Sequence, residues 1–185
     1  TVEVATVSDE TDRGVLYWET GGVLMVFLVG TAVHIAGHFI SVTQQTLGLV
    51  TVNESLWEHL KMGFWPLVVL GVIQYPWLGE DNDNFLVAKV ASAFTVMGTV
   101  FVLVTAYNQF SSEPVLIDII TFAVSCCLGQ VVSYRVLQAD PVGRQTRRVA
   151  LGGAVAVAVS FWVFAVAPPP LELFQDPMTG GYGPQ

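Results

Sequence analysis

The stretch that decides the fold is FLVAKVASAFTVMGTVFVLVTA, residues 85–106, in which Lys89 is the only charged side chain. The hydrocarbon core of a bilayer is about 30 Å thick, so a helix needs roughly 20 mostly apolar residues to cross it. Residues 85–106 reach that length, and they do not alternate between apolar and polar side chains as a barrel strand would. The stretch therefore predicts a transmembrane helix, in which every backbone polar group is paired internally.

Four more stretches of similar length and composition flank this one. They are residues 22–42, 56–78, 115–134 and 149–167. The segments between them are polar and rich in turn-forming residues: TVNES, GEDNDN, NQFSSEP and QADPVGRQTRR. With 53% hydrophobic residues, 12% charged residues and a mean hydropathy of +0.61, the composition excludes an ordinary soluble domain. The predicted fold class is all-α, an integral membrane bundle of five transmembrane helices.

The ends of the chain differ from the apolar part in composition. We expect an acidic N-terminal segment at 1–21, a transmembrane domain at 22–167 and a Pro/Gly-rich tail at 168–185. Three consecutive prolines end the last apolar stretch, because proline cannot continue a helix. Beyond them, the glycine and proline content predicts a mobile end.

The distribution of arginine predicts the orientation in the membrane, because short cytoplasmic loops are enriched in Lys and Arg. Arg135, Arg144, Arg147 and Arg148 lie in or beside residues 138–148. If that loop is cytoplasmic, the alternation of five spans places the N-terminus inside and the C-terminal tail outside. The expected location is a cell membrane, which the chain crosses several times, with the lipid bilayer as its main partner.

The charge balance excludes one class of partner. The chain has 15 acidic and 7 basic residues, a net charge of −8, and no basic patch that would bind nucleic acid. Acidic exposed segments of this kind are typical of proteins from halophilic organisms. The alternative explanation for the acidic composition is a pair of acidic tails without relation to salt. Cys126 and Cys127 are adjacent and point about 100° apart on a helix, so no ordinary disulfide joins them.

Polar side chains within the apolar stretches carry the functional information, because they are costly in a membrane and usually face the bundle. His34 and His38 are four residues apart and share one helix face with Gly30, Gly37 and Ser41. Small residues mark the side on which helices approach closely, so both imidazoles should point inward. Two histidines at this spacing can bind one metal ion, or they can be structural and hydrogen-bonded to neighbours.

The stretch NESLWEHLKMGFWP, residues 53–66, opens the second span with further ionisable groups. Ser55 followed by Glu58 fits a capping box, which accounts for one acid. Glu54, His59 and Lys61 exceed what a cap requires. Glu58 and Lys61 are three residues apart and could form an ion pair.

These polar residues are expected to lie at a similar depth in the membrane, close to one another. The first two spans are antiparallel neighbours, so both histidines of the first lie level with the start of the second, and Asp118 enters the membrane from the same side. We therefore predict a polar site near the outer leaflet. The candidate metal ligands are His34, His38, Glu58 and His59, with Glu54, Lys61 and Asp118 as supporting polar residues.

The block NES-x-WEH-x-K-x-x-FWP, followed by IQY, resembles the hallmark segment of a family of small polytopic membrane proteins of unknown function from bacteria and archaea. The resemblance is specific over residues 34–75 and looser as far as Arg135. It implies a shared fold and a shared site. It implies no activity, because none is established for that family. Together with the acidic composition, it favours a member from a halophilic archaeon.

Three functions remain open. We expect an integral membrane protein with a structural or accessory role, which is a partner of other membrane subunits. Its buried His/Glu cluster would fix the packing of its own helices. One alternative is an intramembrane metal site, with zinc as the expected ion and a hydrolytic or proton-handling role. The other is haem b, held between His59 and His34 or His38. The sequence leaves open whether the protein is an enzyme.

Overall fold

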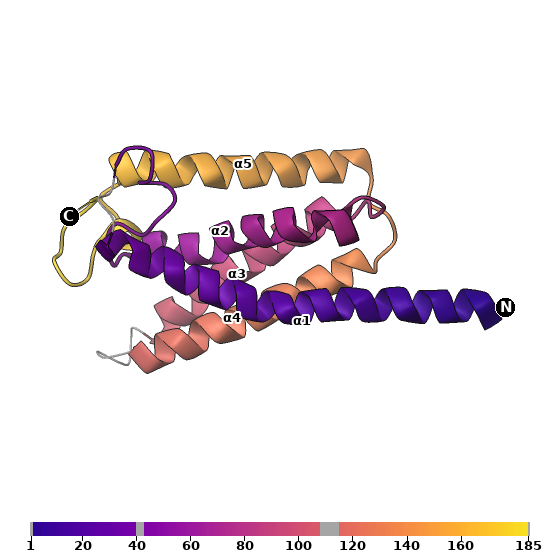
Figure 1. Ribbon diagram of the computed structural model, residues 1–185. Helices are drawn as coiled ribbons and strands as arrows, with labels where there is room; N and C mark the ends of the chain where they lie inside the picture. The colour runs from indigo at the N-terminus through magenta and orange to yellow at the C-terminus, as the bar shows by residue number, and fades with distance from the viewer. Residues whose placement is uncertain (1, 40–42, 108–114, 185) are drawn as a thin grey trace.

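The computed structural model describes residues 2–39, 43–107 and 115–184, without the side chains of residues 2–12 and 38. Within these ranges the chain is helical and contains no strand, only an isolated antiparallel bridge between Gln175 and Tyr182. Five long helices run back and forth along a common direction (Figure 1). They are α1 (Val2–Phe39), α2 (Leu56–Gln74), α3 (Phe85–Tyr107), α4 (Val115–Leu137) and α5 (Arg144–Val166). A short π-helical turn, η1 (Tyr75–Gly79), extends α2, and the 3-10 turn η2 (Glu172–Phe174) follows α5.

Each of the five helices has a segment long and apolar enough to cross a membrane. Large apolar side chains cover the outside of the bundle, among them Val72 (71% exposed), Val102 (61%) and Leu116 (70%). An apolar surface this extensive is unfavourable in water but favourable against lipid. The all-α prediction is confirmed, and the architecture is that expected of a multi-pass membrane protein.

Helix α1 is longer than the sequence suggested, because it already begins at Val2 and its apolar segment is Arg13–Gly37 rather than 22–42. Residues 2–21 contain no proline, so nothing in them forces the helix to end. The predicted acidic segment 1–21 included Glu19. Glu19 is instead 3% exposed and paired with Lys89, so its charge is balanced within the bundle.

The connections gather at the two ends of the bundle (Figure 1). Residues 43–55 and 167–184 lie together at one end, which we call the histidine end because His34 and His59 lie there. Residues 79–84 and 138–143 meet at the other end, which we call the asparagine end. There the Asn84 amide donates to the carbonyls of Val136, Ala139 and Asp140.

The core lies between α1, α2, α3 and α4; among the described residues α5 contributes one fully buried side chain, Phe161, and packs Ala154, Val157 and Ala158 against it. Glycine allows the closest approach. A Cβ on Gly30 of α1 would lie 2.5 Å from the Phe122 ring and 2.7 Å from the Met62 carbonyl oxygen. A Cβ on Gly37 would collide with the Thr51 carbonyl. The small-residue stripe of the first span therefore faces the bundle at both glycines, as predicted, while Ser41 lies outside the described residues.

The C-terminal tail is packed at the histidine end, in contrast to the mobile end that its composition predicted. Phe174 is 6% exposed, and its ring packs against those of Trp57 and Phe164 with centroid distances of 5.0 and 5.2 Å. The Asn53 amide donates to the Gly183 carbonyl at 2.9 Å. Aromatic and polar anchors thus hold a segment whose glycines and prolines alone would suggest freedom.

Candidate functional site

The site at the histidine end begins with the cap of α2. Ser55 is the N-cap, and its Oγ accepts a hydrogen bond from the Glu58 amide at 3.4 Å. In a complete capping box the Glu58 carboxylate would accept from the Ser55 amide. That amide donates to Asn53 Oδ1 instead, at 2.9 Å. The box is therefore half formed, and the Glu58 carboxylate is used elsewhere.

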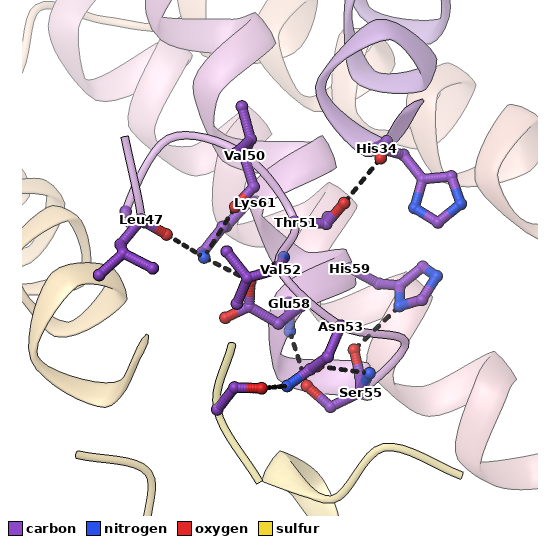
Figure 2. Close-up of polar contacts among 12 residues, drawn as sticks. His34, Leu47, Val50, Thr51, Val52, Asn53, Ser55, Glu58, His59 and Lys61 are labelled. Atoms are coloured by element: carbon purple, nitrogen blue, oxygen red, sulfur yellow. Dashed lines mark hydrogen bonds and ion pairs between the residues drawn. The ribbon is translucent and has the colours of Figure 1, made fainter. Parts of the chain in front are cut away.

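Glu58 forms a buried ion pair with Lys61, as the spacing allowed. Lys61 Nζ lies 2.5 Å from Glu58 Oε2, and the two residues are 0% and 2% exposed. The ammonium also donates to the carbonyls of Leu47 (2.7 Å) and Val50 (3.0 Å), so its three protons all have acceptors (Figure 2). Glu58 Oε2 accepts a further bond from the Val52 amide at 2.9 Å. A buried pair offsets its desolvation cost only with such additional bonds, and here they fix the loop between α1 and α2.

The loop is also fixed to α1 and to the aromatic side chains of α2 and α5. Thr51 Oγ1 donates to the His34 carbonyl at 2.8 Å (Figure 2). Trp65 Nε1 donates to the Gly48 carbonyl at 2.7 Å, and Gly48 packs so closely against Trp162 that a Cβ there would collide with the indole. Residues 43–55 are therefore held by contacts with three helices, α1, α2 and α5.

Two imidazoles and a carboxylate meet beside this loop. The rings of His34 and His59 lie 4.9 Å apart between centroids, tilted by 36°, and Figure 2 shows both on the side of the loop away from Lys61. His59 Nε2 is 3.5 Å from Glu54 Oε2. One ligand atom from each of His34, Glu54 and His59 lies within 4.8 Å of the other two. All three residues are half-buried, so a small ion could reach them.

A backbone carbonyl orients the His59 ring. Nδ1 lies 2.9 Å from the Ser55 carbonyl oxygen (Figure 2), which can only accept a hydrogen bond, so Nδ1 carries the proton. In the neutral ring this leaves the Nε2 lone pair free, on the side where Glu54 lies. Metal-binding histidines are commonly oriented in this way, with the second ring nitrogen donating to a carbonyl or carboxylate.

Asp118 is the next carboxylate. It lies in the first turn of α4, is exposed, and interacts electrostatically with His59 and Glu54. It borders the group of three and belongs to a different helix from either histidine. Two carboxylates, those of Glu54 and Asp118, thus interact electrostatically with His59.

The predicted site residues divide between two neighbouring clusters. His34 and His59 come together as expected, but Glu58 is directed to Lys61, and the carboxylate beside the imidazoles belongs to Glu54, predicted only as a supporting residue. The side chain of His38 lies outside the described residues. Metal binding by these side chains stays a prediction.

Sequence analysis missed a second buried ion pair. Lys89 Nζ lies 2.6 Å from Glu19 Oε1 and donates to Ser133 Oγ at 3.0 Å. A lysine four residues into an apolar span needs an anionic partner, and that need was the available signal. Glu19 was excluded because it was assigned to a separate N-terminal segment.

The chain matches a known protein family. The sequence model of a family described as "Family of unknown function (DUF6512)" matches residues 10–184. No curated protein and no solved structure matches the chain.

Proposed function

The chain belongs to this family of unknown function, and because membership carries no activity we propose a role from the site itself: binding of a divalent, zinc-like cation by a multi-pass protein of the cell membrane. The observation that carries the proposal is the approach of His34, Glu54 and His59 to within 4.8 Å of one another. Two of these side chains come from different helices, and the third comes from the loop between them.

The ligand set is suited to zinc. Two histidines and one glutamate form a familiar three-ligand zinc site, in which the fourth position stays open for water or substrate. Ligands about 2.0–2.1 Å from a tetrahedral ion lie about 3.3–3.4 Å from each other. The 3.5 Å between His59 Nε2 and Glu54 Oε2 is close to that spacing. His34 needs only a side-chain adjustment to complete the set, and Asp118 could hydrogen-bond to a ligand in the open position.

We further propose that the histidine end faces the exterior and the asparagine end the cytoplasm. Arg144, Arg147 and Arg148 begin α5 at the asparagine end, where the positive-inside rule favours the cytoplasmic side. The metal site would then lie at the exterior surface of the cell membrane. Origin in a halophilic archaeon remains part of the proposal, resting on the 15 acidic and 7 basic residues.

The second candidate function is a structural or accessory membrane subunit. It is favoured by the Glu58–Lys61 network, in which every proton of the ammonium has an acceptor, as in a purely structural cluster. The haem alternative is disfavoured for the pair His34 and His59. Their rings pack at 4.9 Å, which leaves no slot for a porphyrin between them.

Metal analysis of the purified protein tests the proposal. Protein in lipid nanodiscs is loaded with zinc, dialysed, and analysed for bound metal and for a haem Soret band. We expect one zinc per chain, with at least a tenfold loss of affinity in His59→Ala and Glu54→Gln. The matched control is Glu172→Gln, which removes an exposed tail carboxylate and should leave binding unchanged. Zinc that is absent, or retained equally by all variants, would favour the accessory role.

A further inference from the structure

A second group of polar side chains is buried toward the asparagine end, among α1, α2, α3 and α4. We call it the polar layer. Its members are Glu19, Gln74, Lys89, Ser92, Gln130 and Ser133. Every one is at most 6% exposed, in helices that are otherwise apolar. Polar groups at such depth are costly, and they commonly mark a functional site.

The Glu19–Lys89 ion pair is the charged part of the layer. Lys89 Nζ contacts Glu19 Oε1 and Ser133 Oγ, and it lies 5.4 Å from the centre of the Phe85 ring. Gln74 of α2 lies next to this part of α1, because its amide donates to the carbonyl of Trp18, the residue before Glu19. The ion pair thus joins three helices, with the fourth beside it.

One helical turn deeper, the layer continues with uncharged groups. Ser92 follows Lys89 by three residues on α3, so the two side chains are neighbours on that helix. Gln130 precedes Ser133 by three residues on α4 and is its neighbour in the same way. Gln130 Nε2 lies 3.0 Å from the position that a Cβ on Gly22 of α1 would take. Ser92 Oγ is equally close to the Cβ position of Gly129. Glycine on the neighbouring helix therefore leaves room for both polar groups.

Most of these polar groups have an atom that the protein does not pair. Within the described part of the chain, no hydrogen-bond partner exists for Glu19 Oε2, Gln74 Oε1, Ser92 Oγ or either amide atom of Gln130. Leaving a buried polar atom unpaired costs about 1–3 kcal/mol. Five such atoms would cost about 5–15 kcal/mol, as much as the whole stability of a typical domain. These atoms need a partner that is not a protein side chain.

The charges and polar atoms of the layer indicate which kind of molecule can pair with these atoms. A further cation would be repelled by the Lys89 ammonium, and an anion would meet Glu19 and several acceptor oxygens. The surface hollows beside Phe94 and beside Leu24 are lined by none of the layer's residues, so no opening for an organic molecule leads into it from either. Water is small, donates and accepts, and bridges about three polar groups at a buried position.

We propose that the polar layer is a binding site for internal water molecules, which connect Gln130 and Ser92 to the Glu19–Lys89 ion pair. One turn of helix spans 5.4 Å, about the length of two hydrogen bonds through a water oxygen. A single water can therefore join Glu19 Oε2 to the group one turn deeper. Proteins contain about one buried water per 27 residues, or about seven for a chain of this length.

Nuclear magnetic resonance of the 185-residue chain in nanodiscs tests the site. Protein labelled with nitrogen-15 at asparagine and glutamine is examined for cross-relaxation between water and side-chain amide protons. Through-bond correlation with the backbone assigns the Gln130 amide, so the experiment needs no variant. We expect a water cross-peak at Gln130. The matched control is Asn84, which is 2% exposed and whose amide already donates to three carbonyls, and it should show none.

The variant Ser92→Ala provides a second measurement. It removes one partner of the water and changes little volume, so the Gln130 cross-peak should weaken while the Asn84 amide keeps its chemical shift. A Gln130 amide without a water cross-peak would overturn the proposal. Equal cross-peaks at Gln130 and Asn84 would also overturn it, because they would show general penetration of water instead of a defined site.

Discussion

The imidazole rings of His34 and His59 lie 4.9 Å apart, although one belongs to α1 and the other to α2. Their approach depends on the loop between the two helices. The Thr51 backbone packs directly against Gly37, and its hydroxyl donates to the His34 carbonyl. The Lys61 ammonium donates to the carbonyls of Leu47 and Val50. The ring pair is therefore a consequence of loop packing, and changes in the loop should separate the rings.

Replacing Gly37 by alanine should destabilise the protein. The new Cβ would collide with the Thr51 carbonyl, and overpacking of this kind costs about 1–3 kcal/mol. The control is Gly98→Ala in α3, where a Cβ meets no atom within 4 Å and helix propensity should add about 0.5–1 kcal/mol of stability. Denaturant unfolding in mixed micelles measures both. Equal effects at Gly37 and Gly98 would contradict the close approach of α1 and the loop.

Lys61→Met should be among the most damaging substitutions in the chain. It leaves the Glu58 carboxylate buried without its cation and removes the donor to two loop carbonyls, and breaking a buried pair costs about 3–5 kcal/mol. Arg147→Met is the control, because the Arg147–Asp83 pair is partly exposed and should contribute only about 0–1 kcal/mol. Thermal unfolding followed by circular dichroism compares the two.

The double variant Glu58→Gln, Lys61→Met separates charge from loop anchoring. It restores neutrality but still leaves the carbonyls of Leu47 and Val50 without the ammonium. We expect it to recover only part of the stability lost in Lys61→Met. Full recovery would mean that the loop does not depend on the lysine.

The sequence predicted the helical class because period and length are local properties. It also showed that Glu58 and Lys61, which are neighbours on one helix, could pair, although it assigned Glu58 as a metal ligand. It assigned the carboxylate next to the imidazoles to Glu58 instead of Glu54, because the direction of Glu58 depends on a loop amide, Val52, whose position no helical spacing determines. The packed tail was missed for a similar reason, since Phe174 meets Trp57 only in the folded bundle.

Labelling of single cysteines should establish the proposed orientation. In a background with Cys126 and Cys127 replaced by alanine, Met178→Cys lies at the histidine end and Gln145→Cys near the asparagine end. Met178 is 80% exposed, and Gln145 is exposed as well. An impermeant maleimide added to intact cells should modify the first and spare the second until the membrane is permeabilised. The opposite pattern would place the metal site on the cytoplasmic side.

Phe174→Ala should release the tail without unfolding the bundle. The ring contacts Trp57 and Phe164, and it is the aromatic anchor of residues 167–184 beside the hydrogen bonds from Asn53 and Glu54. We expect proteolysis within the tail to accelerate at least tenfold, and tryptophan fluorescence to change as Trp57 loses a neighbour. Met178→Ala, at an 80% exposed position, should leave both unchanged. Unaltered proteolysis of Phe174→Ala would show that the polar contacts alone hold the tail.

The bond between the Asn53 amide and the Gly183 carbonyl spans 130 residues of sequence. Ribosomes add about 5–20 residues per second, so the acceptor is synthesised about 7–26 s after the donor. The Glu54 amide likewise waits for Asp176 Oδ2, 122 residues later. During insertion, the first loop therefore has its lysine partner long before it has its tail partner. The histidine end therefore receives its last hydrogen bonds at the end of synthesis, and a chain truncated shortly before Asp176 would lack both of them.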